Sequence, residues 1–516
     1  MGRLSFAQLV RGITSTRPIT AKRSASRSPF IGGPSSLPRR RRPVADGVCK
    51  ILHKEGRLRQ PTNRPPLAVG TDLSYNVATV QAVPARASLH TIGCRLNQAE
   101  TALLADRLRR DGYHLVEFGQ PTDLLVLNTC SVTEHAETDC RYLVRRTLRH
   151  SPHAFVAVTG CYAQTGAEAL RHVPGIDLIV GAQYKMSLPD YLPAPPALRK
   201  QPAPQVLHTR KIDREDFVLG GAGDYQSTRA NLKVQDGCDF MCSFCIIPFA
   251  RGHERSRRPE DVLREAEELA ARGHRELVLT GVNVGRYASG GLSLLDLIRR
   301  LERVAGVERI RISSIEPTTI PDALLDHMAD SEKLCRYLHV PLQSGDDEIL
   351  RAMHRRYTVR DYAAFIEKAV HLIPNLGLGT DLMVGFPGEG ERQFANTLSL
   401  AGELPFGYFH VFSFSRRPGT AAARMGDPVH PATVKARSRT LAELSRAKRL
   451  AFYQGQIGRS VKVLFESRDP DGLWTGLTGD YVRVGLAASS DLSDRLHDVL
   501  VTGAMDGLAV GQLVAC

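Results

Sequence analysis

The sequence predicts an α/β protein in three parts: a small parallel α/β domain, a partial (β/α) barrel and a small C-terminal β-barrel. Apolar strand-like runs alternate with helical runs over residues 88–425, as in proteins built on parallel sheets. After residue 459 the chain changes to short β-like runs broken by Gly and Asp, which is typical of a small barrel. With 516 residues, the chain is long enough for about three domains.

The first part of the chain, residues 1–86, is predicted to be a disordered basic tail. Residues 1–85 hold fifteen Lys or Arg against three Asp or Glu, so they carry most of the net charge of +14. The tail has no acidic residue before Asp46 and is rich in Ser, Arg and Pro, a composition that cannot bury enough apolar surface to fold. An organelle transit peptide, a basic arm that binds nucleic acid and a dispensable extension are the alternatives for its role.

Residues 87–188 are predicted to form the small parallel α/β domain. Apolar strands separated by helices indicate a parallel sheet with both faces covered. The expected strands are 88–93, 124–128 and 155–160, and the expected helices are 97–111, 134–149 and 164–172. A Pro-rich stretch at 189–206 is expected to be extended and to open a linker that runs through residue 225.

The second domain is predicted to span residues 226–430 as a partial (β/α) barrel. Six strands alternate with helices such as 259–272 and 359–372, and this alternation suits a barrel-like parallel sheet. A basic linker helix at 431–458 is expected to precede the C-terminal β-barrel, residues 459–516. No run of eighteen or more apolar residues occurs, so no membrane-spanning helix is expected. The expected strands of the partial barrel are 231–235, 276–281, 308–314, 336–342, 378–385 and 407–413.

Cysteines are the residues that indicate the chemistry. Ten cysteines in so long a chain suggest metal binding in a reducing compartment rather than a disulfide framework. Cys238, Cys242 and Cys245 follow the first strand of the partial barrel with the spacing C-x3-C-x2-C. Three thiolates at this spacing can hold three irons of a [4Fe–4S] cube and leave the fourth iron open. A structural zinc site is the alternative, although such sites are normally closed by four ligands.

A second set of cysteines follows the three strands of the first domain. Cys94, Cys130 and Cys161 each come at the end of one strand. Ligand sites of open parallel sheets lie at the carboxyl ends of the strands, so we expect the three to converge. They predict a second cluster with three protein ligands, and the alternative is that they are buried as small apolar residues. The other four cysteines are interpreted as packing residues.

Seven segments carry the strongest motifs of the chain. They are TIGCRLNQAET at 91–101, LVLNTCSVT at 125–133, VTGCYAQ at 158–164, VQDGCDFMCSFCIIPFARGHERSR at 234–257, HVPLQSGDDEILRAMHRRYT at 339–358, DLMVGFPGE at 381–389 and VFSFSRRPGTAAARM at 411–425. Together they resemble the methylthiotransferase family of radical S-adenosylmethionine enzymes, over about residues 88–515. The resemblance implies a methylthiotransferase N-terminal domain, a radical S-adenosylmethionine barrel and a C-terminal TRAM domain that binds RNA.

This resemblance also implies the reaction and its cofactors. The family inserts a methylthio group at an unactivated C–H bond, and S-adenosylmethionine serves as both methyl donor and radical source. Two [4Fe–4S] clusters are implied, a radical cluster on Cys238, Cys242 and Cys245 and an auxiliary cluster on Cys94, Cys130 and Cys161.

TIGCRLNQAET together with GCYAQ is most similar to the branch that acts on tRNA at N6-threonylcarbamoyladenosine, next to the anticodon. The product of that branch carries a 2-methylthio group. The isopentenyladenosine branch is the close alternative, and the branch that modifies a ribosomal protein is the third.

Polar residues after the barrel strands are the candidates for binding S-adenosylmethionine. In such barrels the functional residues gather at the strand ends, and the alternative is that these side chains cap helices or loops. No catalytic residue is assigned. The candidates are Thr280, Gly281 and Asn283 after the second strand, Ser314 and Glu316 after the third, and Gln343 at the end of the fourth.

Basic and aromatic residues raise the question of where RNA binds. The run of Arg251, Arg255, Arg257 and Arg258 is expected either to face tRNA phosphate or to form an ordinary solvated surface. The C-terminal barrel holds five Lys or Arg against eight Asp or Glu, a poor grip for phosphate, so the basic helix before it is the better candidate. Two aromatic residues of the barrel are interpreted as either stacking on bases or packing in its core. They are Trp474 and Tyr481.

These features predict a radical S-adenosylmethionine tRNA methylthiotransferase in the cytoplasm, or in an organelle if the tail is a transit peptide. Such an enzyme needs tRNA, a sulfur source and an electron donor such as a flavodoxin or ferredoxin. A non-enzymatic iron–sulfur protein that binds RNA and carries electrons or senses redox state is the alternative from another class. It would be expected to hold each cluster with four protein ligands. A radical enzyme with a protein or small-molecule substrate is the third hypothesis.

Overall fold

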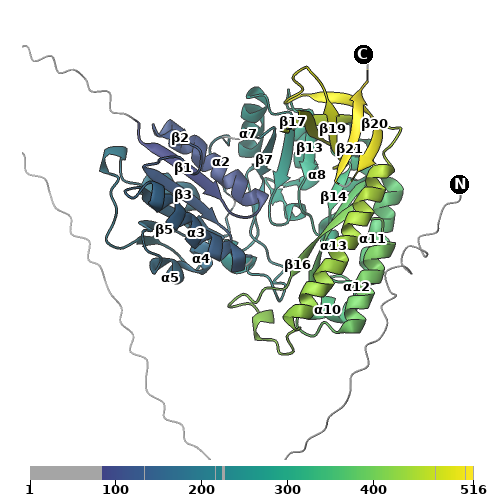
Figure 1. Ribbon diagram of the computed structural model, residues 1–516, viewed down its shortest axis with the longest axis horizontal. Helices are drawn as coiled ribbons and strands as arrows, with labels where there is room; N and C mark the ends of the chain where they lie inside the picture. The colour runs from purple at the N-terminus through teal and green to yellow at the C-terminus, as the bar shows by residue number, and fades with distance from the viewer. Residues whose placement is uncertain are drawn as a thin grey trace, which may run out of the picture. The chain divides into compact units, whose positions relative to one another are not determined.

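The computed structural model describes residues 84–132, 134–215, 217–223, 227–470, 472–505 and 507–514 (Figure 1). The predicted basic tail lies outside these residues, apart from its last three positions. The predicted fold class is confirmed, because a parallel α/β domain, a partial barrel and a closed β-barrel follow one another along the chain. Within the described ranges, no helix combines the length and the apolar character needed to cross a membrane.

The N-terminal domain is built on a six-stranded parallel sheet with the order β2-β1-β3-β4-β5-β6. β3 and β4 are buried along their whole length, as expected for the central strands of a covered parallel sheet. The strands are β1 (Arg86–Thr91), β2 (His114–Val116), β3 (Leu124–Thr129), β4 (Phe155–Gly160), β5 (Leu178–Val180) and β6 (Gln205–Leu207).

Helices cover both faces of this sheet (Figure 1). Successive strand residues point to opposite faces, so Leu124 packs with Leu104 of one helix layer and Leu125 with Val144 of the other. The first layer comprises α2 (Arg95–Arg110) and the 3-10 helix η1 (Ala182–Tyr191), and the second comprises α3 (Glu134–His150), α4 (Cys161–Thr165) and α5 (Ala167–Arg171).

Three strands of this sheet were not predicted from the sequence. β2, β5 and β6 have three residues each, too few for an alternating pattern to be recognised. β6 lies in the expected linker and pairs with β5 through Val206 and Ile179. Part of the predicted linker is therefore an edge strand of the N-terminal domain. Prolines are tolerated beside an edge strand, because one side of such a strand forms no hydrogen bonds to a neighbouring strand.

The central domain holds six parallel strands in two three-stranded sheets, β13-β10-β7 and β14-β15-β16. The bridges Ile310–Leu334 and Ser314–His339 join them, so the strands form one partial barrel. Each strand overlaps one of the six predicted from the sequence. They are β7 (Arg229–Lys233), β10 (Glu276–Thr280), β13 (Arg309–Ile312), β14 (Tyr337–His339), β15 (Gly377–Val384) and β16 (Tyr408–Ser413).

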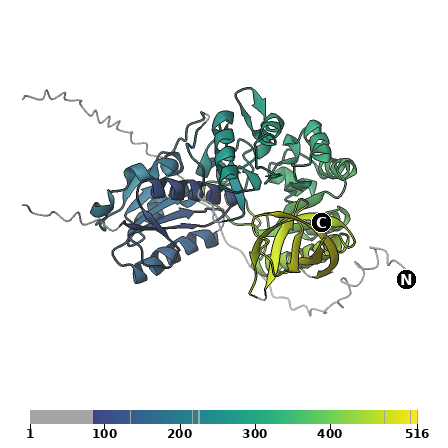
Figure 2. The same cartoon turned by 90° about the horizontal axis from the view of Figure 1, so that it is seen from above.

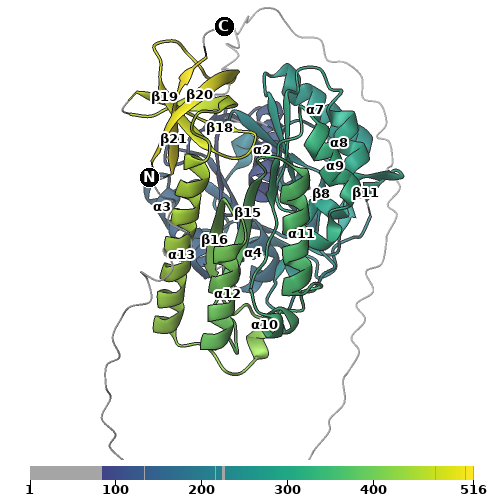
Figure 3. The ribbon, with the colours of Figure 1, turned by 90° about the vertical axis from the view of Figure 1, so that its right-hand side faces the viewer.

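Amphipathic helices pack on the outer side of the partial barrel through one large core. α11, α12 and α13 run side by side along β15 and β16 (Figure 3). Capping boxes at Ser293 and Thr358 begin α8 and α11 and satisfy backbone N–H groups there. The helices are α6 (Ile247–Arg251), α7 (Pro259–Ala271), α8 (Leu294–Leu301), α9 (Asp322–Asp330), α10 (Asp347–Ala352), α11 (Val359–Leu372), α12 (Glu391–Glu403) and α13 (Pro431–Gln454), and two short strands, β8 (Gln235–Asp236) and β9 (Arg255–Ser256), pair with each other.

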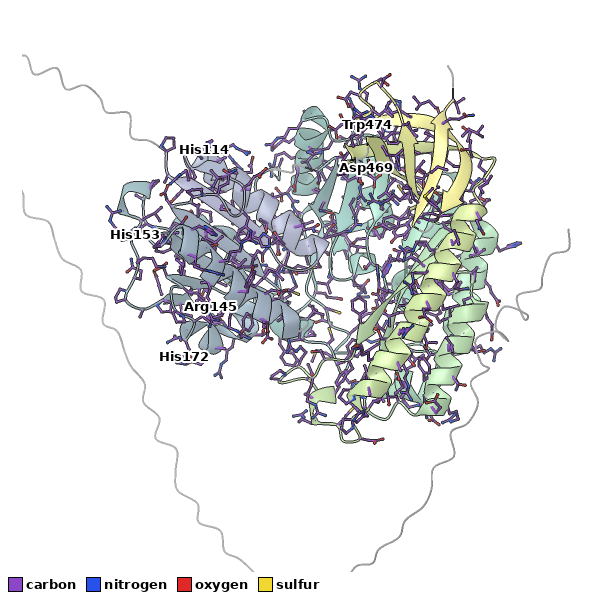
Figure 4. All side chains as sticks on the ribbon, viewed as in Figure 1. His114, Arg145, His153, His172, Asp469 and Trp474 are labelled. Atoms are coloured by element: carbon purple, nitrogen blue, oxygen red, sulfur yellow. The ribbon has the colours of Figure 1, made fainter. Side chains whose placement is uncertain are left out.

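The C-terminal domain is a closed barrel with the strand order β17-β18-β19-β21-β20 (yellow in Figure 2). β20 pairs back onto β17, and this closure removes the free sheet edges. Phe465 and Val484 are in its core, and Trp474 lies half-buried on β18 (Figure 4). The strands are β17 (Ser460–Arg468), β18 (Leu473–Thr478), β19 (Arg483–Ala487), β20 (Leu496–Met505) and β21 (Leu508–Leu513).

A buried ion pair fixes the turn between β18 and β19 against the central domain. The Arg311 side chain on β13 is 1% exposed, and its Nε lies 2.7 Å from Oε1 of Glu276 on β10, whose side chain is 0% exposed. The other two nitrogens of the guanidinium donate to the carbonyl oxygens of Thr478 and Gly479, at 2.9 and 3.0 Å. This turn carries Tyr481, which has the unusual φ of +70°.

We expect Glu276→Gln to lower the free energy of unfolding by about 3 kcal/mol, because it leaves the Arg311 charge buried without its carboxylate. Burial alone would raise the pKa of Glu276, but Arg311 and Arg309 lower it to about 2. A carboxyl group with a depressed folded pKa stabilises the fold above its unfolded pKa of about 4.3, and this contribution is lost as the pH falls towards the folded pKa.

The measurement is guanidinium unfolding of wild type and variant at pH 7 and at several acid pH values. The difference in the free energy of unfolding between wild type and variant should shrink as the pH falls from about 4.3 to about 2. Glu308→Gln is the matched control, since that carboxylate forms an exposed ion pair with Arg275, and it should leave stability unchanged. Equal stability of Glu276→Gln and wild type at pH 7 would contradict the prediction.

Candidate active site

Three cysteines lie at the carboxyl ends of three neighbouring strands of the N-terminal sheet. Cys94 follows β1, Cys130 follows β3 and Cys161 follows β4. Cys130 and Cys161 are buried, whereas Cys94 is exposed. Burial, with smaller contributions from the other two thiols, raises the pKa of Cys130 to about 11. The three cysteines thus follow adjacent strands at one edge of the sheet, and their role as cluster ligands stays a prediction.

Two glycines that precede these cysteines allow the close approach of the strand ends. Gly93 has a φ of +108°, and a Cβ at this position would lie 2.8 Å from Cβ of Cys130. Gly160 has a φ of +100°, and a Cβ there would collide with the backbone of Thr129. Only glycine fits both the backbone conformation and the space. The Gly-Cys pairs of the sequence thus set where two of the thiols lie.

Cys238, Cys242 and Cys245 lie in the loop between β8 and α6. The Phe240 N–H donates to Sγ of Cys238 at 3.5 Å, and Nη1 of Arg355 donates to Sγ of Cys242 at 3.4 Å. Such hydrogen bonds stabilise negative charge on sulfur and tune iron–sulfur centres. The Arg355 side chain is 3% exposed and also forms an ion pair with Glu316.

Both cysteine sets offer thiols, which is the donor chemistry of iron–sulfur ligands. Burial raises the pKa of Cys238 to about 11 and that of Cys245 to about 12, so metal binding has to displace protons from them. In the described part of the chain, neither set brings its three sulfurs all within 4.8 Å of one another. Three thiolates can bind three irons of a [4Fe–4S] cube, one sulfur to each iron.

The basic run after the Cys238 loop is largely buried, which corrects the prediction that it faces tRNA or solvent. Arg251 and Arg257 are 2% and 0% exposed, and Arg255 pairs with Asp236. Arg257 forms ion pairs with two acidic residues of α7. Buried cations need such partners, which the sequence supplies four and eight residues later. Arg258 is exposed.

A buried charge network joins α2, which begins just after Cys94, to the segment that follows the Cys238 loop. Glu100 on α2 lies 2.6 Å from Nζ of Lys185, 2.6 Å from Nζ of Lys233 and 3.0 Å from Nη1 of Arg251. Nη1 of Arg251 is also 2.9 Å from Asp236. Removing one member of such a network leaves the remaining charges unpaired in a low-dielectric interior. The network therefore holds the two cysteine-bearing segments in a fixed relation.

A cavity of about 290 Å³ receives residues from all three folded parts of the chain. Cys94 and Arg95 line it from the N-terminal domain. Thr280 and Ser314, at the ends of β10 and β13, line it from the partial barrel. Tyr481 lines it from the C-terminal domain.

Buried polar atoms around this cavity have no partner in the described part of the chain. They include Oγ of Ser313, Nδ2 of Asn283 and Oδ1 of Asp381. The last of these is 2.9 Å from Nε2 of His339, yet the two do not form a hydrogen bond. Ligand atoms of His339, Asp381 and His410 all lie within 4.8 Å of one another. Because buried polar groups are normally satisfied, these atoms indicate a polar ligand.

The residues predicted to bind S-adenosylmethionine fall into two groups. Thr280, Gly281 and Ser314 line the cavity. The other three contact the protein, as the capping alternative expects. Asn283 accepts hydrogen bonds from the Glu316 N–H and the Thr319 hydroxyl, and the Glu316 carboxylate pairs with Arg355. Gln343 has a φ of +69° and forms a β-bridge with Leu382. Asn283 still has one unpartnered nitrogen among the described residues.

Sequence reasoning missed most of the aromatic and imidazole residues of the cavity. Tyr337 and His339 alternate on β14, and Tyr408 and His410 alternate on β16. Alternate residues of a strand share one face, so the repeated Tyr-x-His pattern was the signal that could have identified them. Tyr481 stacks on Tyr337 with ring centroids 4.5 Å apart. The sequence offered base stacking or barrel-core packing as interpretations of Tyr481, and neither placed it in this cavity.

Two family models match the chain. The Radical SAM superfamily matches residues 232–401, and Uncharacterized protein family UPF0004 matches residues 86–181. Threonylcarbamoyladenosine tRNA methylthiotransferase MtaB from Bacillus subtilis (strain 168) is 36% identical over 437 residues, covering 83% of this chain and 96% of the relative. The chain belongs to the radical S-adenosylmethionine tRNA methylthiotransferase family. It is therefore an enzyme, which removes the non-enzymatic alternative, and its class uses S-adenosylmethionine and a [4Fe–4S] cluster.

Relatives from two substrate branches resemble this methylthiotransferase about equally. MtaB from Aquifex aeolicus (strain VF5) is 34% identical, covering 73% of this chain and 92% of the relative. The tRNA-2-methylthio-N(6)-dimethylallyladenosine synthase of Maricaulis maris (strain MCS10) is 35% identical, covering 74% of this chain and 86% of the relative. Overall identity consequently does not choose between the two modified adenosines.

Proposed function

We propose that this methylthiotransferase acts on tRNA and attaches a methylthio group to C2 of N6-threonylcarbamoyladenosine next to the anticodon. The observation that carries the proposal is the cavity, which joins Cys94 of one cysteine set to strand ends of the partial barrel and is lined by charged and hydrogen-bonding side chains. A threonylcarbamoyl group offers a carboxylate, a hydroxyl and ureido N–H groups to such a lining, whereas a dimethylallyl group offers only hydrocarbon.

The two cysteine sets are proposed to hold two [4Fe–4S] clusters. Cys238, Cys242 and Cys245 would hold the radical cluster, and the strand-end set described above would hold the auxiliary cluster. When bound, the clusters and S-adenosylmethionine supply the sulfur, the methyl group and the radical that removes hydrogen from C2. An electron donor such as a flavodoxin or ferredoxin, a sulfur source and a cytoplasmic location are part of the proposal.

The protein's own residues would orient the nucleoside and exclude water. Thr280, Gly281 and Ser314 offer small side chains and exposed backbone where the strands end. Oγ of Ser313 has no partner among the described residues and is available for a polar group of the substrate or of S-adenosylmethionine. The Asp381 carboxylate also lines the cavity, 2.9 Å from Nε2 of His339. Tyr481 lines the cavity and stacks on Tyr337, and the bound nucleoside would help to exclude water from a site where a radical must not be quenched.

A cationic groove of about 560 Å³ at the carboxyl ends of β15 and β16 is a candidate for tRNA phosphate. Arg416, Lys435 and Arg439 line it and are exposed. The basic helix supplies fewer free charges than its sequence suggested, because Arg437 is buried in ion pairs with two acidic residues and Lys448 donates to a backbone carbonyl.

We expect the triple change Arg416→Ala, Lys435→Ala and Arg439→Ala to weaken tRNA binding roughly tenfold or more and to reduce the salt slope by about 2. The measurement is fluorescence anisotropy with labelled tRNA over a series of salt concentrations. Replacing three exposed arginines on and after α8 is the control for charge alone; these are Arg299, Arg300 and Arg303. Equal effects of the two triple variants would mean that the groove does not contact phosphate.

The test of the proposed function begins with anaerobic reconstitution of the full chain with iron and sulfide. The protein is incubated with S-adenosylmethionine, a reductant and tRNA that lacks methylthio groups, and the nucleosides are analysed by mass spectrometry. We expect a methylthio product on N6-threonylcarbamoyladenosine. With deuterium at C2 of that nucleoside, the label should appear in 5′-deoxyadenosine.

The dimethylallyladenosine branch is the second candidate, favoured by the 35% identity of the Maricaulis relative. The same assay with tRNA carrying N6-dimethylallyladenosine tests it. Product on that tRNA alone would replace the proposed substrate while keeping the chemistry. Cleavage of S-adenosylmethionine without product on either tRNA would reject both substrates.

A further inference from the structure

Overall identity leaves the substrate branch open, so a local feature of the cavity has to discriminate between the modified adenosines. We propose that Arg95, held by the hydroxyl of Tyr481, binds the carboxylate of the threonyl group and is the main specificity-determining residue for this substrate. The inference rests on the proposed function, because it names the part of that substrate which Arg95 recognises.

Arg95 lies at the Cys94 end of the cavity, where the proposal places C2 of the substrate adenine. It directly follows Cys94, is the first residue of α2 and lines the cavity. Its Nη2 donates to the hydroxyl of Tyr481 at 2.8 Å. A single side chain of the N-terminal domain thus reaches across the cavity to the C-terminal domain.

Unlike other arginines of the site, Arg95 has no carboxylate partner among the described residues. Arg311 pairs with Glu276, and Arg355 pairs with Glu316. By contrast, no Asp or Glu oxygen of the described residues lies within 4.0 Å of the Arg95 guanidinium. A half-buried cation whose neighbour is a phenol is incompletely satisfied. It retains free N–H donors in the fork geometry that binds a carboxylate through two parallel hydrogen bonds.

The chemistry of the substrate brings its carboxylate to this place. In N6-threonylcarbamoyladenosine, the ureido N–H that carries the threonine can donate to N1 of the adenine. That hydrogen bond turns the threonyl group towards the edge that also contains C2, the carbon that receives sulfur. If C2 faces the Cys94 end of the cavity, the carboxylate comes within reach of the residue that follows Cys94.

Neighbouring residues add hydrogen-bonding groups to a cavity that Leu96, Ile312 and Phe412 also line. The Tyr408 hydroxyl lies 3.4 Å from Nδ1 of His339 and 2.6 Å from the Tyr337 hydroxyl. The Asp381 carboxylate lies 2.9 Å from Nε2 of His339 and can also accept from the threonyl hydroxyl or a ureido N–H. A dimethylallyl group in this cavity would desolvate Arg95 without giving its free N–H donors a partner, and a desolvated donor left unpaired is a strong means of rejecting an analogue.

The test compares two tRNA substrates in wild type and in variants of Arg95. One tRNA carries N6-threonylcarbamoyladenosine, and the other carries the same group with its carboxylate converted to a neutral carboxamide. Formation of the methylthio nucleoside gives kcat/KM for each. Iron content, the electron paramagnetic resonance spectrum and 5′-deoxyadenosine formation are measured in parallel, because Arg95 adjoins Cys94.

In wild type we expect the carboxylate substrate to be preferred over the carboxamide by roughly tenfold to a hundredfold. Arg95→Gln should remove this preference by lowering kcat/KM for the carboxylate substrate alone, with normal iron content. Arg95→Lys should restore part of it, since a lysine keeps the charge but not the paired donors. Arg107→Gln is the matched control, because this arginine is on the same helix in exposed ion pairs.

Tyr481→Phe is a second variant that tests the role of Arg95, at a position far in sequence from the cysteines. It keeps the ring stack on Tyr337 and removes the hydroxyl that orients Arg95, so it should reduce the preference by roughly threefold. Equal use of carboxylate and carboxamide by wild type would overturn the proposal, as would an equal loss on both substrates in Arg95→Gln. Failure of the proposed function is a different result, in which wild type forms no product from N6-threonylcarbamoyladenosine at all.

Discussion

Cys242→Ala will abolish reductive cleavage of S-adenosylmethionine, lowering 5′-deoxyadenosine formation by at least about a hundredfold. Three protein ligands are the whole set that the C-x3-C-x2-C loop supplies, so the loss of one leaves two irons of the cube without protein ligands. The cluster is then lost or its potential changes, and the electron that starts the reaction is not delivered. The measurement is chromatographic detection of 5′-deoxyadenosine after anaerobic incubation with reductant.

The surroundings of Cys242 make this the most informative of the three positions proposed to hold the radical cluster. Arg355 donates to its sulfur and also pairs with Glu316, so the substitution also leaves a buried guanidinium without one partner. Cys335→Ala is the matched control, because this buried cysteine belongs to neither set. Cleavage at the wild-type rate by a Cys242→Ala protein with a full iron complement would refute the assignment of the loop.

Local patterns were sufficient to predict the framework of the site. Each strand of the partial barrel is an apolar run bounded by turns, and period and length identify such runs without tertiary information. The Cys94, Cys130 and Cys161 positions could be placed together because parallel strands end at one edge of a sheet. Gly93 and Gly160 then follow from the crowding of that edge.

Features that depend on other segments could not be predicted in the same way. Arg251 has the sequence context of a basic surface run, and only the folded chain brings Glu100 of the N-terminal domain to it. Likewise, Tyr481 belongs by sequence to the C-terminal barrel. Its position in the cavity depends on how Arg311 holds the β18–β19 turn.

The pocket as a whole was missed for the same reason. The repeated Tyr-x-His pattern is visible in the sequence, but its meaning depends on β14 and β16 facing one lumen on either side of β15. Arg95 has no distinctive pattern at all. Arg95 becomes a candidate for substrate recognition only from the folded chain. There its guanidinium contacts the Tyr481 hydroxyl and no carboxylate of the described residues, whereas Arg311 and Arg355 each pair with a carboxylate.

Cys130→Ala is expected to have the opposite consequence from Cys242→Ala: S-adenosylmethionine is still cleaved, and no methylthio nucleoside is formed. Cys130 is on the N-terminal sheet, and the described residues give it no hydrogen bond to the Cys238 loop. Under the proposed assignment, removing it takes one ligand from the auxiliary cluster and leaves the radical cluster intact. The measurements are 5′-deoxyadenosine and methylthio nucleoside from the same reaction, with iron per chain expected to fall by roughly half if each site holds one four-iron cluster.

Cys140→Ala is the matched control for this experiment. Cys140 is buried on α3 in the core of the same domain, and burial raises the pKa of its thiol to about 12, so the substitution tests loss of a buried cysteine without loss of a ligand. It should keep both products and the full iron content, at a cost in stability of about 1 kcal/mol for the lost packing. Unimpaired methylthiolation by Cys130→Ala would remove the auxiliary cluster from this sheet edge. Loss of both products would instead mean that the two cysteine sets do not act separately, because the charge network through Glu100 and Arg251 would then transmit damage from one to the other.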